Sequence, residues 1–229
     1  MARSFEYIFD SLQRQKRDAD ATSGECQFEA LVRCSYLEIY NEQIMDLLEP
    51  GSVNLHIRED IKKGVYVEGL TEEVVSSAQD MIDLTVRGSK NRHVGCTSMN
   101  KESSRSHSVL TTIIETKASK DFGGVWNIKT SRFHIIDLAG SERQKYTNAM
   151  GDRLKEAGMI NKSLSALGNV INSLVDISEG KNRHVHYRDS KLTFLLRDSL
   201  GGNSKTCIIA NVSPALTCLG ETVSTLKFA

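Results

Sequence analysis

The segment F-H-I-I-D-L-A-G-S-E, residues 133–142, decides the fold. Its first four residues are mostly apolar and predict a buried strand that ends at Asp137. In open α/β sheets, ligands bind beyond the carboxyl ends of the strands, and an Asp at that place can hold a metal-bound water. Gly140 has no Cβ, so its N–H can approach a phosphate closely. The segment therefore indicates a phosphate site at a sheet edge, although a strand ended by a helix-capping Asp is the alternative.

A second polar segment, N-K-E-S-S-R-S-H at residues 100–107, is dense in short hydrogen-bonding side chains. The hydroxyls of Ser103 and Ser104 could ligate Mg²⁺ or bond a terminal phosphate, because Mg²⁺ prefers hard oxygen ligands completed by phosphates and waters. Arg105 could pair with an acidic side chain. A solvated serine-rich loop before a strand is the alternative. The chain contains no G-x-x-x-x-G-K-[ST] and no G-x-G-x-x-G, so it has no self-contained phosphate cradle of the usual kind.

Hydrophobic periodicity places these segments in one α/β domain that covers residues 1–229. Apolar residues at helical spacing predict helices at 4–17, 41–49, 77–87, 158–176, 190–200 and from 221 onward. β-Branched or alternating patterns predict strands at 28–36, in short pieces over 53–75, at 107–116, at 131–137 and at 206–212. A D-F-G-G turn at 121–124 is expected to join two of these strands as an antiparallel hairpin.

The composition excludes several classes of protein. The chain carries 29 Lys and Arg against 29 Asp and Glu, which argues against a polycation that coats nucleic acid. No apolar run is long enough for a membrane span, and the N-terminal residues lack a signal-peptide core, so neither a membrane nor secretion is expected. Five cysteines without a C-x-x-C pair favour a reducing cytosol over a disulfide framework or zinc site. His93, His107 and His134 lack metal-ligand spacing and are interpreted as structural histidines.

Charge is distributed unevenly along the chain. Residues 141–205 hold 11 Lys and Arg but 7 Asp and Glu, and the remainder of the chain carries the matching negative excess. A local basic face suits an acidic partner surface. A merely solvated face is the alternative.

Taken in series, these motifs resemble the kinesin motor domain over nearly all of the chain. Besides the two segments above, the matching stretches are I-N-K-S-L-S-A-L-G-N-V-I at 160–171, H-Y-R-D-S-K-L-T at 186–193, L-x-D-S-L-G-G-N at 196–203 and the closing E-T-x-S-T-L-x-F-A. The stretches at 141–145 and 188–203 are most similar to the kinesin-twelve class of spindle motors. The serial match argues against an unrelated GTPase-like switch protein. The resemblance implies an α/β motor domain with a mixed central β-sheet flanked by helices.

The resemblance also implies ATP and Mg²⁺ as ligands of the first switch, residues 100–107. Asn100 and Ser103 would line the nucleotide site, with Ser103 near the γ-phosphate, and Ser104 would ligate Mg²⁺. Such short polar side chains suffice because phosphoryl transfer needs positioning and charge stabilisation rather than covalent chemistry.

Residues 137–142 would be the second switch. Asp137 would hold Mg²⁺ through its water shell, and Gly140 would sense the γ-phosphate. Glu142 would pair with Arg105 and help position water for hydrolysis.

A third set of residues would bind the microtubule, the track of the motor. By resemblance, the chain binds microtubules, with no nucleic acid or membrane as a partner, and acts in the cytoplasm on the cytoskeleton, including the mitotic spindle. Asn161 would relay the nucleotide state along the helix that it opens. The residues expected to meet tubulin, whose surface is acidic, are Arg143, Lys145, Lys162, Arg188 and Lys191. A homo-oligomeric parent, joined by a coiled-coil stalk outside these residues, is compatible with the resemblance.

Two parts of the family's pattern are missing from the 229 residues. The P-loop that family members carry before the helix resembling residues 4–17 is absent, and so is the neck linker after the last helix. We therefore expect a motor domain truncated at both ends, which keeps both switches and the microtubule face of a microtubule-stimulated ATPase. The alternative is a non-enzymatic microtubule-binding fragment that cannot hydrolyse ATP.

Overall fold

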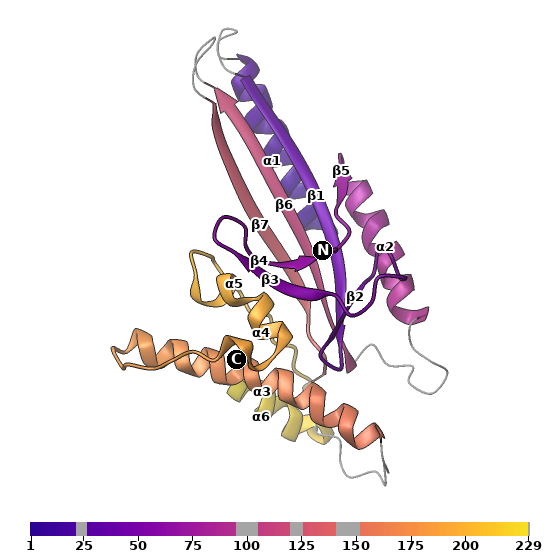
Figure 1. Cartoon of the computed structure of the whole chain (residues 1–229), viewed down its shortest axis with the longest axis vertical. Coiled ribbons are helices and arrows are strands. Elements are labelled where there is room, and N and C mark those ends of the chain that lie inside the picture. Colours follow the sequence, from indigo (N-terminus) through magenta and orange to yellow (C-terminus); the bar gives the residue numbers. More distant parts are fainter. Residues whose placement is uncertain (22–26, 95–104, 120–125, 141–151, 229) are drawn as a thin grey trace.

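The structure is a computed structural model that describes the chain except residues 22–26, 95–104, 120–125, 141–151 and 229 (Figure 1). For residues 93–94, 152–161 and 228 it describes the backbone alone. The strands are β1 (Gln27–Tyr40), β2 (Gln43–Asp46), β3 (His56–Asp60), β4 (Gly64–Glu68), β5 (Glu73–Val75), β6 (His107–Ser119) and β7 (Asn127–Asp137). The helices are α1 (Ala2–Ala21), α2 (Ala78–Val94), α3 (Asp152–Ser178), α4 (Lys191–Leu195), α5 (Arg197–Gly201) and α6 (Leu219–Phe228), with short 3₁₀ turns η2 (Tyr187–Asp189) and η3 (Leu216–Cys218).

The main sheet has the order β2-β1-β6-β7, and β5 pairs with a further part of β1. Strand β6 pairs with β1 along most of its length and with β7 on its other edge, so three long strands lie side by side (Figure 1). Every pairing among the described strands is antiparallel, where the resemblance implied a mixed sheet. The pairing of β6 with β7 confirms the antiparallel arrangement that the sequence predicts, while the expected turn at 121–124 lies outside the described residues. Strands β3 and β4 form a separate two-stranded sheet.

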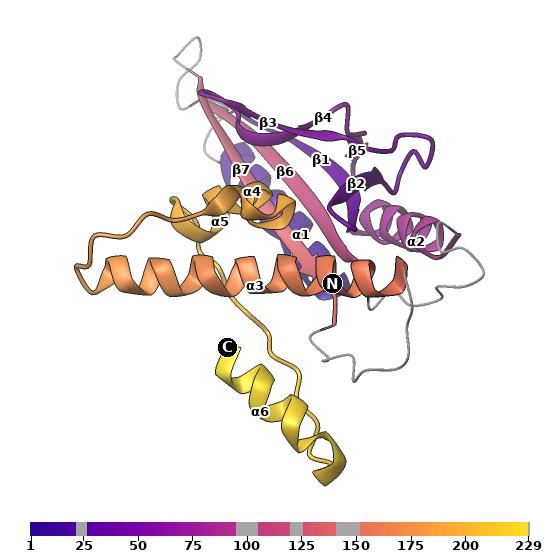
Figure 2. The ribbon, with the colours of Figure 1, turned by 60° about the horizontal axis from the view of Figure 1, so that its bottom comes forward.

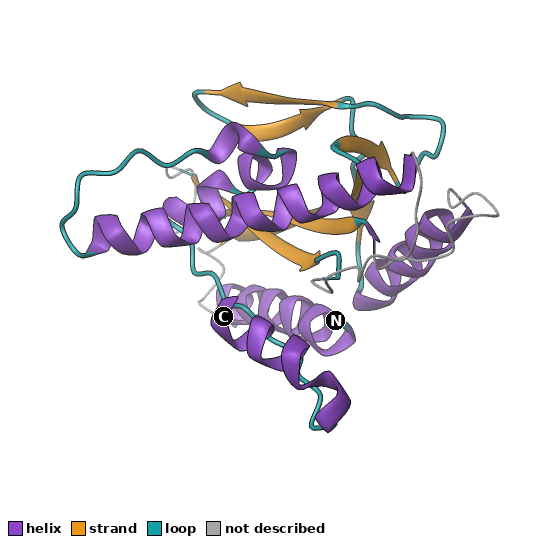
Figure 3. Cartoon of the chain, turned by 90° about the horizontal axis from the view of Figure 1, so that it is seen from below, coloured by secondary structure: helices purple, strands orange, loops and turns teal. Residues whose placement is uncertain are grey.

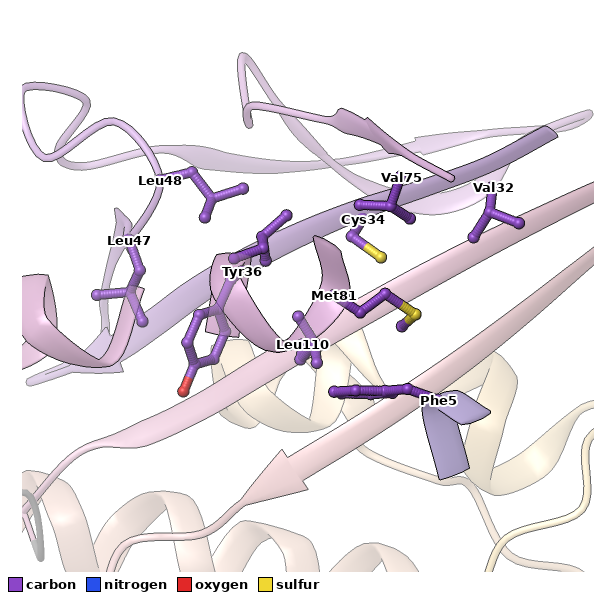
Figure 4. Close-up of a cluster of buried hydrophobic side chains, with 10 residues drawn as sticks. Phe5, Val32, Cys34, Tyr36, Leu47, Leu48, Val75, Met81 and Leu110 are labelled. Atoms are coloured by element: carbon purple, nitrogen blue, oxygen red, sulfur yellow. The ribbon is translucent and has the colours of Figure 1, made fainter. Parts of the chain in front are cut away.

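Alternate residues of β1 supply two hydrophobic cores, because side chains alternate between the faces of a strand. Val32, Cys34 and Tyr36 pack with residues of α1 and α2, as the close-up in Figure 4 shows for Phe5 and Met81. On the other face, core residues from β1 and β6 pack with residues of α3 and α4: these are Leu37, Ile39, Val109, Leu167 and Leu192. Figures 2 and 3 show the result, a sheet with α3 crossing one face and with α1 and α2 on the other. The fold is therefore a three-layered α/β arrangement.

The expected helix at 41–49 is wrong. Asn41 and Glu42 have φ values of 50° and 57°, and they form the two-residue turn that joins β1 to β2. Two successive residues in the left-handed region are typical of the tight turns whose twist matches that of the two hairpin strands. Apolar residues after the turn therefore belong to a strand and its exit, with Ile44 in one core and Leu47 in the other.

The expected strand at 206–212 also differs from the structure. The segment has an irregular backbone, pairs with no described strand, and leaves the Ile209 side chain 83% exposed. A β-branched sequence becomes a strand only where a neighbouring strand offers hydrogen bonds, and local composition does not supply that neighbour. The other predicted helices are present, and α3 extends beyond its predicted limits to Asp152–Ser178. The predicted helix after Ser190 is divided at Leu196 into α4 and α5. Within the described part of the chain, no helix is both long and apolar enough to cross a membrane.

Candidate functional site

A buried arginine organises the carboxyl end of β7. Arg92, in the last turn of α2, donates from Nη1 to Asp137 Oδ2 at 2.8 Å and to Ser108 Oγ at 3.2 Å, and from Nη2 to the Ser106 carbonyl at 2.9 Å. Its Nε lies 3.7 Å from Glu38 Oε1, and the side chains of both residues are only 7% exposed. The planar guanidinium can satisfy several acceptors at once, which a lysine cannot do. Arg92 thereby joins α2, β1, β6 and the end of β7.

The Asp137 carboxylate keeps one side open although Arg92 anchors it. Its side chain is 61% exposed, and an ionised carboxylate has about four lone-pair positions on its two oxygens. This fits an oxygen that holds water around Mg²⁺, because Mg²⁺ keeps several waters and takes one or two carboxylates together with phosphates. Among the described residues there is no cluster of three or more metal-ligating side chains.

His107 connects the exit of β7 to the long helix α3. Its Nδ1 accepts a hydrogen bond from the Ala139 backbone N–H at 2.9 Å, and its Nε2 lies 2.7 Å from Ser163 Oγ. Because Nδ1 is the acceptor, the network assigns the proton of the neutral ring to Nε2, which donates to Ser163. Burial, aided by the Arg92 cation, lowers the pKa of His107 to about 4, and Asp137 opposes this shift. The interpretation of His107 as a structural histidine is thus consistent with its buried, bonded ring.

Only part of the predicted nucleotide site lies within the described residues. Arg105 is half-buried just before β6, and Gly140 follows Ala139 at the exit of β7. The predicted nucleotide-site residues outside the described part are Asn100, Ser103, Ser104 and Glu142, and the predicted microtubule-binding residues outside it are Arg143 and Lys145. Asn161 lies on α3, but its side chain is not described. The Arg105–Glu142 pair and the Mg²⁺ ligand Ser104 therefore stay predictions.

The predicted track-binding residues that are described lie on α3 and around α4. Lys162 is exposed on α3, in the same turn as Ser163. The Arg188 side chain is 76% exposed, with Nη2 3.2 Å from Glu59 Oε2 and Cζ 5.1 Å from the Phe194 ring centroid. The Lys191 backbone N–H donates to Glu42 at 2.8 Å. Helix α3, which carries Lys162, and helix α4, which follows Arg188, pack on the same face of the sheet, as Figure 2 shows for the two helices.

Sequence reasoning missed Arg92, Glu42 and Glu59. Their partners lie 45, 148 and 129 residues away along the chain, so no local motif marks them. A charged residue near a helix end or in a turn is usually solvent-exposed, and Arg92 differs only because the fold surrounds it with acceptors.

The fold, an antiparallel sheet flanked by helices, is that of a motor domain, and comparison with known proteins agrees. The family model described as the kinesin motor domain matches residues 1–229, so the chain belongs to the kinesin motor domain family. It is 61% identical over 227 residues to the kinesin-like protein KIF15 of Strongylocentrotus purpuratus, which covers 99% of this chain and 15% of that protein. It is 58% identical over 231 residues to the kinesin-like protein KIN-12D of Arabidopsis thaliana, which covers 100% of this chain and 8% of that protein.

These relatives confirm the similarity to the kinesin-twelve class, and the chain spans less than a fifth of their length.

Solved structures agree with the fold. A structure of a fast kinesin has a TM-score of 0.79 and 46% identity, covering 96% of this chain and 60% of that one. A structure of a KIF14 dimer in a two-heads-bound state, with AMP-PNP and in complex with a microtubule, has a TM-score of 0.83 and 41% identity. The match covers 99% of this chain and 62% of that one.

Proposed function

We propose that this chain is the switch and track-binding part of an ATP-dependent microtubule motor. The observation that carries the proposal is the connection from Arg92 and Asp137, at the end of β7, through Ala139 and His107 to Ser163 on α3. A displacement of the β7 exit must move or break a bond that holds α3. Because α3 carries Lys162 on its exposed side, this connection gives the nucleotide end a mechanical path to the binding face.

The chain's own residues would divide the work as follows. Asp137, oriented by Arg92, would hold the water shell of Mg²⁺, and Ser104 would ligate the ion directly. Bound Mg²⁺ would supply neutralisation of the phosphate charge. Asn100 and Ser103 would line the nucleotide site, Gly140 would approach the γ-phosphate with its N–H, and Glu142 paired with Arg105 would orient water.

The partner of the basic face would be the microtubule. Support comes from the KIF14 structure in complex with a microtubule and from the exposed cations on the α3 and α4 side. The residues proposed to contact tubulin are Arg143, Lys145, Lys162, Arg188 and Lys191. We propose that the protein acts on the microtubule cytoskeleton and, as its resemblance to the kinesin-twelve class of spindle motors implies, on the spindle.

A second candidate function follows from the missing G-x-x-x-x-G-K-[ST] loop. Without that cradle and its lysine, these 229 residues leave the β-phosphate without its usual holder. We propose that they bind microtubules without hydrolysing ATP on their own. Co-sedimentation of the chain with microtubules, combined with phosphate release in the same samples, tests both candidates. Binding without phosphate release supports the second, and no binding contradicts both.

A further inference from the structure

The turn between β1 and β2 holds the segment that carries Arg188 and Lys191. Glu42 Oε1 accepts a hydrogen bond from Ser190 Oγ at 2.9 Å, and Oε2 accepts from the Lys191 backbone N–H at 2.8 Å. Both oxygens of one carboxylate are thus used on two successive residues. This contact joins positions 148 and 149 residues apart and connects the main sheet to the start of α4.

The carboxylate suits its partners in number and kind. Ser190 is 1% exposed, and its hydroxyl accepts from the Leu192 N–H at 3.1 Å while donating to Glu42. The Ser190 hydroxyl therefore donates its proton to Glu42, and one of its lone pairs accepts the hydrogen bond that caps α4. A glutamine at position 42 could accept at only one of its two ends, because the amide NH₂ is a donor. The carboxylate accepts from both donors, whereas a glutamine that accepts from the Lys191 N–H would leave the Ser190 hydroxyl proton without this acceptor, even though its NH₂ could donate to the second lone pair of Ser190 Oγ.

The backbone aims this side chain. Asn41 and Glu42 occupy the left-handed region, with φ of 50° and 57°, and the Tyr40–Gln43 pair closes the turn. L-residues other than Asn and Asp adopt this conformation rarely, and it persists where the surroundings determine it. The two hydrogen bonds to Ser190 and Lys191 are such a determinant.

We propose that Glu42 is a positioning residue that sets the 186–193 segment for microtubule binding. The proposal rests on the proposed function, since it assigns a role in the same binding face. Arg188 lies two residues before Ser190, and Lys191 is itself one of the bonded residues. A released segment would have to be ordered again on binding, at the expense of affinity.

The sign of the effect separates positioning from charge. Glu42 is an acid close to a surface that would meet an acidic polymer. Removing its charge should strengthen binding if only electrostatics matter, because repulsion is relieved. Positioning predicts the opposite, a weaker complex. Charge therefore cannot explain a loss of affinity in a variant that becomes more positive.

The test uses the 229-residue chain with Glu42→Gln, Glu42→Asp and the control Glu49→Gln. Glu49 is exposed beyond β2, and its side chain has no hydrogen bond to the 186–193 segment within the described structure. Microtubule co-sedimentation gives the affinity, and hydrogen exchange gives the protection of the Lys191 and Leu192 amides. Urea unfolding identifies any variant that fails to fold.

We expect Glu42→Gln to bind about three- to tenfold more weakly, with faster exchange at Lys191, from the ordering of one or two side chains. Glu42→Asp should also weaken binding, because its shorter side chain keeps the charge but not the reach. Glu49→Gln should bind as the parent does or slightly tighter.

Three outcomes contradict the proposal or its basis, and they can be told apart. Glu42→Gln binding that equals or exceeds that of the parent overturns the role of Glu42 while leaving the proposed function intact. Weaker binding with unchanged protection of Lys191 overturns positioning as the cause. A parent chain that does not bind microtubules contradicts the proposed function itself.

Discussion

His107 accepts a hydrogen bond at Nδ1 from the backbone N–H of Ala139, over 2.9 Å, two residues beyond the end of β7. The opposite ring nitrogen contacts Ser163 of α3 at 2.7 Å. A neutral imidazole can accept on one side and donate on the other, whereas a protonated ring can only donate. The joint between the β7 exit and α3 therefore requires an uncharged His107.

The stability of the fold should fall in mild acid for this reason. Folding lowers the pKa of His107 from 6.5 to about 4, mainly through burial, so the unfolded chain binds more protons between these values. The free energy of unfolding is therefore unaffected by the titration of this histidine above pH 6.5, and it decreases as the pH falls from 6.5 toward 4. Between pH 7 and pH 5, the linkage amounts to about 2 kcal/mol of unfolding free energy. Burial and Arg132 lower the pKa of His134 to about 4 as well, which adds a loss of the same sign.

Urea unfolding at pH 7 and pH 5 measures this effect, with His107→Gln as the comparison. We expect the glutamine variant to be less stable at pH 7, and its further loss between the two pH values to be smaller by about 2 kcal/mol. An unchanged pH dependence in His107→Gln would show that the ring does not titrate in this range.

Arg92→Ala should be among the most damaging single changes in the described core. It removes a buried cation next to Glu38 and Asp137, and breaking a buried ion pair costs about 3–5 kcal/mol. Arg92→Lys keeps the charge but lacks the planar guanidinium with its several donors. We expect the free energy of unfolding to fall by about 2 kcal/mol because hydrogen bonds are not made.

The exposed pair of Arg58 and Glu68, 3.0 Å apart, provides the control for this measurement. Arg58→Ala should change the unfolding free energy by less than about 1 kcal/mol, because solvated ion pairs contribute little. Urea unfolding at pH 7 compares the three variants. Similar losses for Arg92→Ala and Arg58→Ala would mean that Arg92 does not organise the end of β7.

The purified chain should release no phosphate from ATP above background. The reason is chemical, since positioning of the β- and γ-phosphates supplies most of the catalysis in phosphoryl transfer, and the 229 residues contain no P-loop. A phosphate-release assay with and without microtubules measures this. Microtubule-stimulated release that disappears in Glu142→Ala would contradict the expectation and assign hydrolysis to this chain.

Elements with strong periodicity were predictable from the sequence. Strands β6 and β7 are rich in β-branched residues, and α3 has apolar residues at every third or fourth position. The turn at Asn41 and Glu42 was missed because two-residue hairpin turns are usually marked by Asn-Gly or Asp-Gly. Segment 206–212 carries strand composition without a described partner strand, which only tertiary structure can show.

The position of Asp137 was predictable because it follows directly from a strand, whereas its predicted role in the site stays a prediction. Asp137 ends a strand as its apolar run indicates, and it lies exposed at the sheet edge. The residues that orient it were hidden, because Arg92 and Asp137 are 45 positions apart and belong to different elements. Ionic contacts of this range depend on the completed fold, so spacing along the chain cannot reveal them.

We propose that the α3 and α4 side binds microtubules through its cations, of which Arg188 is exposed and Lys191 is half-buried. Its most direct test is co-sedimentation across a salt series with Arg188→Ala/Lys191→Ala, beside Lys16→Ala/Arg17→Ala. The control removes the same charge from exposed positions of α1, on the opposite face of the sheet.

The account predicts that the Arg188 and Lys191 variant binds about tenfold more weakly at low salt, from two lost charge contacts. The difference should shrink as salt screens charges over about 10 Å, while the α1 control binds as the parent does. Equal affinities for both double variants and the parent at every salt concentration would contradict the claim.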